Sequence, residues 1–428
     1  MPRTRPSGCL APAGYCRAGP GFSTPACAHN MPSPNAYQRV LSFAQLTRNW
    51  RRLFRSTRAS SRNTAGSDGQ SLNNFSREPT GEIRALARDL ESRSFVFSPL
   101  KPHLIPKPNG KDRLICVPTV RDRVVQRTLL EFLSKKYHDK LANKISYGFV
   151  KGRTVQDAAR QACKLRTTWP WVLKTDICSF FDQIDRELLS REMRRIVLDR
   201  SLHDILHLAI ACEIGVESRS QRNKIHLLGI KEGLGVRQGM PLSPFFSNVV
   251  LAPFDCEIQN RNIPAVRYAD DLIFFSNSEQ GCKQILNECI AILDTLNLQV
   301  PELELNTKTE IYEPAKPAEF LGLGISKSGT GYSLRLLDKQ RETIRNRILA
   351  MGSVKELISQ RITLENLGST IANRLSGYIA AYVCCDNIAE LEHDLEFLRQ
   401  KVLKRIYRKE LKIPLAELSA EARAFLDL

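Results

Sequence analysis

Apolar residues recur about every three to four positions over long parts of this chain, the spacing that places them on one face of an α-helix. Near the start, for example, Leu46, Trp50 and Leu53 fall on a single helical face. The C-terminal part follows the same period almost without interruption, so we expect an all-α module there. The helical stretches are residues 37–55, 82–90, 122–141 and 336–428.

Other segments show the pattern of β-strands. Residues 99–117 predict a β-hairpin that turns at residues 108–110, where Pro, Asn and Gly follow one another. Strands and helices are expected to alternate over residues 171–325. Within that part, one strand ends at Asp176 and a helix begins near Asp185, a suitable N-cap. The pattern therefore predicts an α+β fold, with an α/β body followed by an α-helical module.

The N-terminal segment has no Asp or Glu before Asp68 and is rich in Pro, Gly, Ser and Arg. Residues 1–35 show no sustained period, so we expect them to be disordered. Their composition also suits a transit peptide, although they lack the clear amphipathic face of one. In a further alternative, the native protein starts at Met31 and does not include the preceding residues. Residues 36–77 are expected to form a helix and then a polar linker or loop at 56–71.

Charge narrows the class of partner. The chain has 428 residues and 42% hydrophobic content, enough for a core, yet its formal net charge is +18. This excess favours nucleic acid over an anionic membrane, because the basic residues are spread along the chain. No apolar run is long enough to cross a bilayer, which predicts a soluble, cytoplasmic protein. The 12 cysteines include no CxxC pair or zinc-site spacing, as expected of reduced thiols.

Acidic residues stand at the ends of two apolar runs. Asp270 and Asp271 are flanked on both sides by apolar residues, as at the tip of a tight hairpin. Taken alone, the pair favours an ordinary turn, but adjacent carboxylates between buried strands are costly without a cation. Together with Asp176 on a neighbouring strand, they would hold two Mg²⁺ ions roughly 4 Å apart, an arrangement that catalyses phosphoryl transfer.

Short motifs surround these aspartates in a fixed order. They include Tyr-Ala-Asp-Asp and Gly-Val-Arg-Gln-Gly, and they lie at residues 104–113, 121–126, 146–149, 152–153, 171–182, 235–244, 268–271, 306–309 and 320–324. As a set they resemble the reverse transcriptases, particularly the bacterial lineage related to group II intron and retron enzymes. The resemblance covers residues 101–325 and implies a right-hand polymerase, with fingers and palm at 78–325 and an α-helical thumb at 326–428.

The resemblance implies roles for the acidic site. Asp176, Asp270 and Asp271 match the metal ligands of the family, with the backbone carbonyl of Ile177 as a further ligand. The cofactor would be two Mg²⁺ ions, with Mn²⁺ as an alternative. Lys308 resembles the lysine that protonates the leaving pyrophosphate, and a plain surface lysine is the alternative interpretation.

Further residues match positions around the incoming nucleotide. Lys107 and Arg113, on the predicted hairpin, would meet its triphosphate, and Gln238 would border its pocket. Phe181 would lie under the sugar, where its ring excludes a ribose 2′-hydroxyl and so selects dNTPs; core packing is the alternative. Arg237 stands where relatives often have Pro, and it would change the rigidity of the loop or contact a phosphate.

Nucleic-acid contacts are implied on three surfaces. Gly322 belongs to the segment matching the primer-gripping hairpin at residues 320–324. The candidate template contacts, some of which are expected to be core or surface residues, are Arg121, Arg123, Tyr147, Phe149 and Arg153. The thumb's basic face, or else an ordinary charged helix face, comprises Arg341, Arg345, Arg347, Lys401, Lys404, Arg405, Arg408 and Lys409.

The activity implied is RNA-templated DNA synthesis from dNTPs, with a noncoding RNA as the template and a DNA product in a hybrid duplex. No DNA-binding or endonuclease module and no Val-Thr-Gly thumb signature are recognisable, so the chain is most similar to stand-alone reverse transcriptases of antiviral defence against phage. Three alternatives stay open: a retron or group II intron-type enzyme, untemplated DNA synthesis, and a non-catalytic RNA-binding scaffold. The oligomeric state is not indicated.

Overall fold

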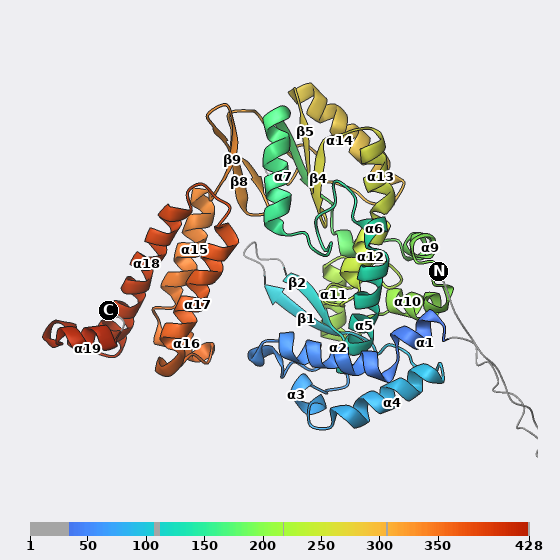
Figure 1. The fold of residues 1–428 in the computed structure, drawn as a ribbon, viewed down its shortest axis with the longest axis horizontal. Coiled ribbons are helices and arrows are strands. Elements are labelled where there is room, and N and C mark those ends of the chain that lie inside the picture. Colours follow the sequence, from blue (N-terminus) through green and yellow to red (C-terminus); the bar gives the residue numbers. More distant parts are fainter. Residues whose placement is uncertain (1–33, 107–111, 217, 305–306, 427–428) are drawn as a thin grey trace, which may run out of the picture.

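The computed structural model describes residues 34–106, 112–216, 218–304 and 307–426. The expectations for residues 1–33 and for the hairpin turn at 108–110 lie outside these residues. Figure 1 shows a mixed body of helices and strands, beside a separate lobe made of the C-terminal helices. Strands form three small sheets, and helices make up most of the remainder. The predicted α+β class is confirmed.

The N-terminal helices form a layer at the base of the body (Figure 1). The predicted helix is two helices, α1 and α2, and the apolar face of α2 is buried, with the ring of Trp50 4.4 Å from that of Phe75. The loop after α2 is packed rather than free, because a Cβ at Gly66 would lie 2.6 Å from the Cα of Thr119. The helices of this layer are α1 (Ala36–Val40), α2 (Phe43–Ser56), α3 (Leu72–Phe75) and α4 (Pro79–Glu91). Farther along the chain, α5 (Val120–Lys136) and α6 (His138–Leu141) lead away from the base into the body (Figure 1).

The predicted hairpin is present as two antiparallel strands, β1 (Lys101–Pro106) and β2 (Asp112–Val117). The hairpin has a small hydrophobic core of its own. In it, Leu114 and Cys116 of β2 pack with Ile225 of α11 (Arg219–Leu227). The hairpin and α11 therefore form one unit, although about a hundred residues of sequence separate them.

A four-stranded antiparallel sheet forms the centre of the body, in the order β4-β5-β3-β6. Side chains along β5 alternate: Phe274 joins the core shared with α14, whereas Ile273 and Phe275 join the core shared with α7. Helices therefore cover both faces of the sheet. The elements are β3 (Trp171–Asp176), β4 (Ala265–Tyr268), β5 (Asp271–Ser276), β6 (Glu310–Tyr312), α7 (Val155–Thr168) and α14 (Glu279–Asp294).

Only helices lie between β3 and β4 in the described residues, so the predicted alternation of strands and helices is wrong there. Their apolar residues, such as Leu188, Leu189 and Met193, have helical spacing and enter the main core. Asp185 is the N-cap of α9, as predicted, and its carboxylate accepts from the N–H groups of Glu187 and Leu188. The helices, besides α11, are α8 (Phe180–Gln183), α9 (Arg186–Ile196), α10 (His203–Ile210), α12 (Ser243–Val250) and α13 (Ala252–Asn260).

The chain after residue 336 is helical, as predicted, and follows a three-stranded sheet. Asn387 joins the two parts: its side chain accepts from the Leu336 N–H at 2.9 Å and donates to the Leu336 carbonyl at 3.0 Å. We call residues 338–426 the C-terminal lobe. The elements are β7 (Ala318–Phe320), β8 (Leu323–Ser328), β9 (Gly331–Arg335), α15 (Asp338–Ala350), α16 (Val354–Ser359), α17 (Leu364–Tyr382), α18 (Ile388–Lys404) and α19 (Ala420–Phe425).

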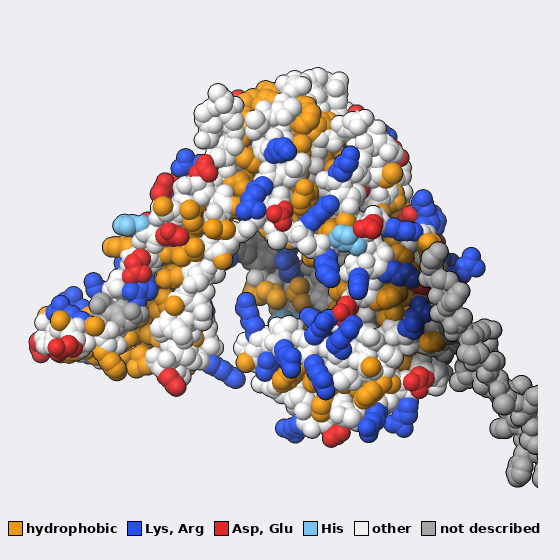
Figure 2. All heavy atoms as spheres, viewed as in Figure 1, with side chains coloured by type: hydrophobic (Ala, Val, Ile, Leu, Met, Phe, Trp, Pro, Cys, Tyr) orange, Lys and Arg blue, Asp and Glu red, His pale blue; other side chains and the backbone are white. Residues whose placement is uncertain are grey.

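Figure 2 shows an open hollow between the C-terminal lobe and the body, with Lys and Arg side chains gathered on the body side of it. On α2, Arg48, Arg51, Arg52 and Arg55 are all exposed. A basic surface of this kind suits a polyanionic partner. Among the helices of the described residues, none combines the length and the apolar character that a membrane span requires.

Candidate active site

The three predicted aspartates lie at the ends of two neighbouring strands. Asp176 ends β3 and stands opposite Asp271, the first residue of β5, in the antiparallel register. Asp270 occupies the tight turn between β4 and β5, and its carbonyl accepts from the Ile177 N–H at 3.2 Å. The structure therefore brings Asp176, Ile177, Asp270 and Asp271 together.

A buried arginine is hydrogen-bonded to the backbone of this turn. Arg267, on β4, donates to the Ala269 carbonyl at 3.1 Å, within a turn where Ala269 has a φ of +57°. Its guanidinium also forms an ion pair with Asp255, and both side chains are buried. Asn248 accepts a hydrogen bond from Arg267 at 3.2 Å and donates to the Gly148 carbonyl at 3.0 Å. These contacts define the position of the acidic turn.

The sequence prediction missed Arg267, Asp255 and Asn248 as parts of the site. One signal was available: Arg267 is a charged residue within an otherwise apolar strand, and a buried charge requires a partner. Its partners lie 12 and 19 residues away on other elements, so spacing did not identify them.

Lys308 forms an ion pair with the carboxylate of Asp176. Partial burial acts to lower the pKa of the Lys308 ammonium, but its hydrogen bond to Asp176 and the charges of Asp270 and Asp271 outweigh that effect and raise it. Burial, and then the Asp270 charge, raise the pKa of Asp271 to about 6. The pKa of Asp270 is also raised, by burial and by Asp176, against the opposing charges of Lys308 and Arg113. The site therefore concentrates negative charge that a cation would stabilise.

A cavity of about 460 Å³ opens beside these aspartates. Its wall combines acidic, basic, aromatic and amide side chains from distant parts of the sequence, whereas Asp271 is outside the lining. Apolar residues at and after the end of α11, Leu227, Leu228 and Ile230, complete the wall, and no sequence signal distinguished them from core residues. The predicted residues that line it are Arg113, Asp176, Ile177, Phe181, Gln238, Asp270 and Lys308.

The donor set fits a hard divalent cation. Carboxylates of Asp176 and Asp270 and the backbone at Ile177 meet at the cavity, and Mg²⁺ prefers such oxygen ligands. Within the described residues, no group of three or more His, Cys, Asp or Glu side chains is close enough together to hold a metal ion without rearrangement. Because Lys308 is paired with Asp176, a metal ion would have to replace this ammonium at that carboxylate.

The predicted template contacts lie outside the cavity lining, and three of them are engaged in structural contacts. Arg121 forms an ion pair with Asp89. Arg123 donates to the Thr64 carbonyl at 3.4 Å, and burial lowers its pKa. Arg153 donates to the carbonyls of two residues, Asn143 and Ser146.

The aromatic members of the predicted template contacts form a cluster next to the acidic turn. The Arg153 guanidinium lies 4.9 Å from the ring centre of Tyr147. The Phe149 ring is 6.5 Å from that of Tyr268, the residue that ends β4, and 49% of Phe149 is exposed. Phe149 is therefore the aromatic residue of this cluster most available to a base.

Three other predicted residues have distinct outcomes. Gly322 has a φ of +78° between β7 and β8, and a Cβ there would meet no atom within 4 Å, so its surface is open. Lys107 lies outside the described residues. Arg237 is buried and paired with Glu213 at 3.0 Å, so the alternative that it contacts a phosphate is wrong.

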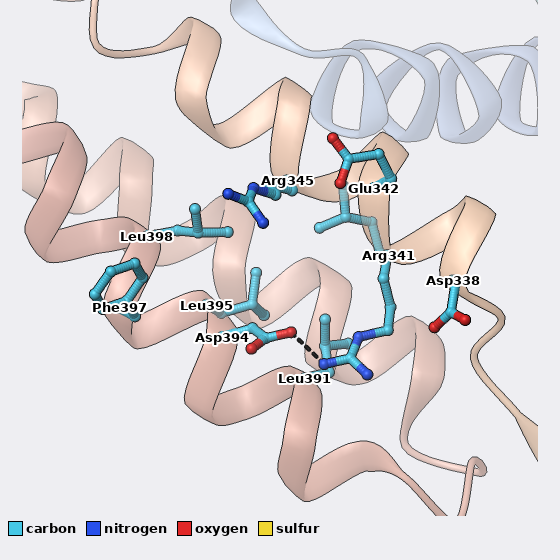
Figure 3. A pocket seen from close by; sticks show the side chains of 10 residues that line it. Asp338, Arg341, Glu342, Arg345, Leu391, Asp394, Leu395, Phe397 and Leu398 are labelled. Carbon is cyan, nitrogen blue, oxygen red and sulfur yellow. Dashed lines mark hydrogen bonds and ion pairs between the residues drawn. The ribbon is translucent and has the colours of Figure 1, made fainter.

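A second cavity, of about 390 Å³, lies in the C-terminal lobe between α15 and α18 (Figure 3). Arg341 joins these helices by pairing with Glu390 at 2.8 Å and Asp394 at 2.5 Å. Arg345, a predicted thumb contact, also lines the cavity, as does the exposed Phe397. This cavity lacks the acidic turn and is a separate surface from the candidate active site.

The sheet order and the acidic turn place this fold in the right-hand class of nucleic-acid polymerases. A family model described as "Reverse transcriptase (RNA-dependent DNA polymerase)" matches residues 105–325, about half of the chain. The chain therefore belongs to the reverse transcriptase family, as its motifs indicated.

Curated relatives support this assignment. Protein YkfC of Escherichia coli K12 is 29% identical over 226 residues, covering 51% of this chain and 55% of that protein. The Retron Ec83 reverse transcriptase of Escherichia coli is 32% identical over 181 residues, covering 41% and 53%. An uncharacterised 91 kDa protein in the cob intron of Schizosaccharomyces pombe is 26% identical over 178 residues, covering 42% and 21%. The chain spans about half the length, or less, of these relatives.

Among solved structures, a telomerase from Candida albicans in complex with a fragment of telomeric RNA is similar with a TM-score of 0.39 and 14% identity. The match covers 78% of this chain and 64% of that chain. A similarity at this level carries no argument about function.

Proposed function

We propose that this chain is an RNA-directed DNA polymerase that adds dNTPs to a primer by phosphoryl transfer. One observation carries the proposal: the cavity gathers the acidic residues Asp176 and Asp270 with basic, aromatic and amide side chains from separate parts of the chain. These are Arg113, Phe181 and Gln238. Acidic groups that bind metal and a cation that binds phosphate are the parts this reaction needs.

The metal ligands we propose are Asp176, Asp270, Asp271 and the carbonyl of Ile177, which would hold two Mg²⁺ ions, or Mn²⁺ in their place. When bound, the ions would lower the pKa of the primer hydroxyl and neutralise the charge on the leaving pyrophosphate. The raised pKa values of Asp270 and Asp271 support this assignment, because burial, and then neighbouring carboxylates, disfavour the charged forms that a bound cation would stabilise.

The remaining cavity residues would bind the nucleotide. Arg113 would hold the triphosphate, with Lys107 beside it, and Gln238 would border the base and sugar. Phe181 would lie against the sugar and exclude a 2′-hydroxyl, which makes dNTPs the substrate. Lys308, once released from Asp176, would be placed to give a proton to the pyrophosphate.

We propose an RNA template and a hybrid duplex product as partners. Gly322 would face the primer, and the duplex would lie in the basic hollow between the body and the C-terminal lobe (Figure 2). In this proposal the fingers and palm span residues 78–325 and the thumb residues 326–428, in a cytoplasmic protein. The template contacts would be Arg121, Arg123, Tyr147, Phe149 and Arg153, with Arg121, Arg123 and Arg153 acting through the loops they support.

For the biological role, we propose defence against phage with a noncoding RNA as template, by analogy with stand-alone reverse transcriptases. The similarity to the Retron Ec83 enzyme and to an intron-encoded protein favours a second role, in a retron or a group II intron. A structured RNA or an intron encoded beside the gene would support the second role. Sequencing of the nucleic acid that copurifies with the protein would separate the two.

The test of the activity uses the purified full chain with Mg²⁺, a primed RNA template and dNTPs. We expect primer extension that is lost in Asp270→Ala plus Asp271→Ala. The matched control, Asp294→Ala, removes an exposed carboxylate at the end of α14 and should leave extension unchanged. Extension without a template would indicate untemplated synthesis. No extension by the wild type, or extension that survives the double substitution, would contradict the proposal.

A further inference from the structure

Three charged residues form a network behind the nucleotide cavity. Glu213 lies between two arginines: Arg186 donates to its Oε1 at 2.6 Å, and Arg237 donates to its Oε2 at 3.0 Å. The Gly233 N–H donates to Oε1 as well, at 2.8 Å. None of the three charged residues lines the cavity. Any effect of these three residues on a bound nucleotide must therefore be transmitted through the backbone segments to which they are hydrogen-bonded.

The network joins the loop that bears Gln238 to the segment that bears Phe181. The Nε of Arg186, on α9, donates to the Gly235 carbonyl at 2.8 Å. In the same loop, the Gly235 N–H donates to Ile184 and the Val236 N–H donates to Phe181, each at 2.8 Å. Gly235 has a φ of +78°, and a Cβ there would lie 2.7 Å from the Phe181 carbonyl. The two segments are thus in direct backbone contact.

The same network reaches the hairpin that carries Arg113. The backbone carbonyl of Glu213 accepts from the Leu100 N–H at 2.8 Å, directly before β1. At the other end of the loop, the Gln238 carbonyl accepts from the Cys116 N–H of β2 at 2.7 Å. Arg113, Phe181 and Gln238 therefore come from three segments, and the Arg186–Glu213–Arg237 network is attached to all three.

The charges of the network are unequal. Two guanidinium groups share one carboxylate, so the formal net charge of the network is +1. Burial of Glu213 acts to raise the pKa of its carboxyl group, but the hydrogen bonds from Arg186, Gly233 and Arg237 outweigh burial and lower this pKa. Arg237 is 1% exposed, and its Nε and Nη1 find no partner among the described residues. Its remaining donor also bonds the Lys231 carbonyl at 2.7 Å. The position of Arg237 thus depends on Glu213 and on this loop.

We propose that Arg237 is a positioning residue for nucleotide selection, which sets the distance between Gln238 and Phe181 through its ion pair with Glu213. The proposal rests on the proposed function, since it assumes that the cavity binds a dNTP. Loss of the Arg237 guanidinium would loosen the loop and displace Gln238, although it removes none of the side chains that line the cavity. The defect should therefore appear in nucleotide binding and in discrimination at the sugar, and much less in the chemical step.

The decisive variant is Arg237→Met. It leaves Arg186 and Glu213 as an ion pair of one positive and one negative charge, and it replaces the guanidinium with an apolar side chain of similar length. With dTTP on a primed RNA template, we expect the KM for dTTP to rise about tenfold, with kcat within about twofold of the wild type. The KM for primer–template should not change. The preference for dTTP over ribothymidine triphosphate, which differs from it only by the 2′-hydroxyl, should fall. Arg195→Met, at an exposed position of α9, is the matched control and should match the wild type.

Glu213→Gln supplies an independent readout, because it leaves two buried or half-buried cations without their carboxylate. Its unfolding midpoint should lie below that of Arg237→Met, and Arg237→Lys should restore part of the lost dTTP affinity. If Arg237→Met does not fold, Arg237→Lys takes its place in the kinetic test.

Two results would overturn the inference: a folded Arg237 variant with the wild-type KM and sugar preference, or a loss of kcat and stability without a change in KM. A wild-type chain that incorporates no dTTP would instead contradict the proposed function.

Discussion

Single buried charges decide how the acidic turn is held. Arg267 and Asp255 form an ion pair in which each side chain is 1% exposed, directly beneath the turn that bears Asp270. Arg267→Met would leave the Asp255 carboxylate buried without its cation. Breaking a buried pair in this way typically costs about 3–5 kcal/mol. We therefore expect a loss of that size in the free energy of unfolding, measured by urea denaturation.

The control for this substitution is Arg261→Met. Arg261 also pairs with acidic residues, at 3.1 Å from Glu288, but its side chain is 42% exposed. An exposed pair contributes at most about 1 kcal/mol, so this variant should unfold close to the wild type. Equal stability of the two variants would show that the Arg267 pair does not support the turn energetically.

At the scale of elements, the approach of one loop to the β4–β5 turn is limited by a glycine. A Cβ at Gly148 would lie 2.2 Å from the backbone nitrogen of Ala269, so Gly148→Ala must displace the turn. We expect about 1–3 kcal/mol of destabilisation. Primer extension should fall more steeply than this stability loss implies, because the displaced turn carries Asp270. Thermal unfolding and extension assays on the same preparation would compare the two effects.

A matched glycine lies in α17. A Cβ at Gly368 would meet no atom within 4 Å, so Gly368→Ala should leave the protein unchanged or up to about 1 kcal/mol more stable. Full extension activity in Gly148→Ala would contradict the view that this loop fixes the turn.

Elements with local signals could be predicted from the sequence, and those with distant partners could not. The end of the strand at Asp176 and the N-cap at Asp185 can each be recognised from a few neighbouring residues in the sequence. Both are as predicted. Between β3 and β4 the prediction of alternating strands and helices was wrong, although the helix after Asp185 was predicted, because short apolar runs do not separate a buried helix from a strand. The Lys308–Asp176 pair joins residues 132 positions apart, beyond the reach of any local pattern.

The candidate site shows the same division. Motif resemblance named seven of the fifteen residues that line the cavity, including Arg113, Phe181 and Gln238. It did not give the role of Arg237, whose partner Glu213 lies 24 residues away on another segment and has no motif around it. The residues that hold a site are harder to predict than those that line it, because their partners are set by the tertiary fold.

At the scale of the whole molecule, the net charge of +18 makes nucleic-acid binding dependent on salt. We predict that the C-terminal lobe contributes through Arg345 and Arg347, both exposed on α15. Replacing both with Gln should weaken binding of an RNA–DNA hybrid. It should also reduce the slope of log affinity against log salt by about two, or about one for each lost phosphate contact.

Neutralising Arg261 and Lys283 with Gln is the matched control. These exposed residues lie directly after α13 and on α14, and both helices are across the sheet from the C-terminal lobe (Figure 1). Each change removes two positive charges, so a general effect of net charge would lower affinity equally in both variants. A specific contact would lower the slope only when Arg345 and Arg347 are replaced. Equal slopes of log affinity against log salt in the two variants would show that Arg345 and Arg347 do not contact the duplex. The α2 side of the hollow would then remain as the surface that binds it.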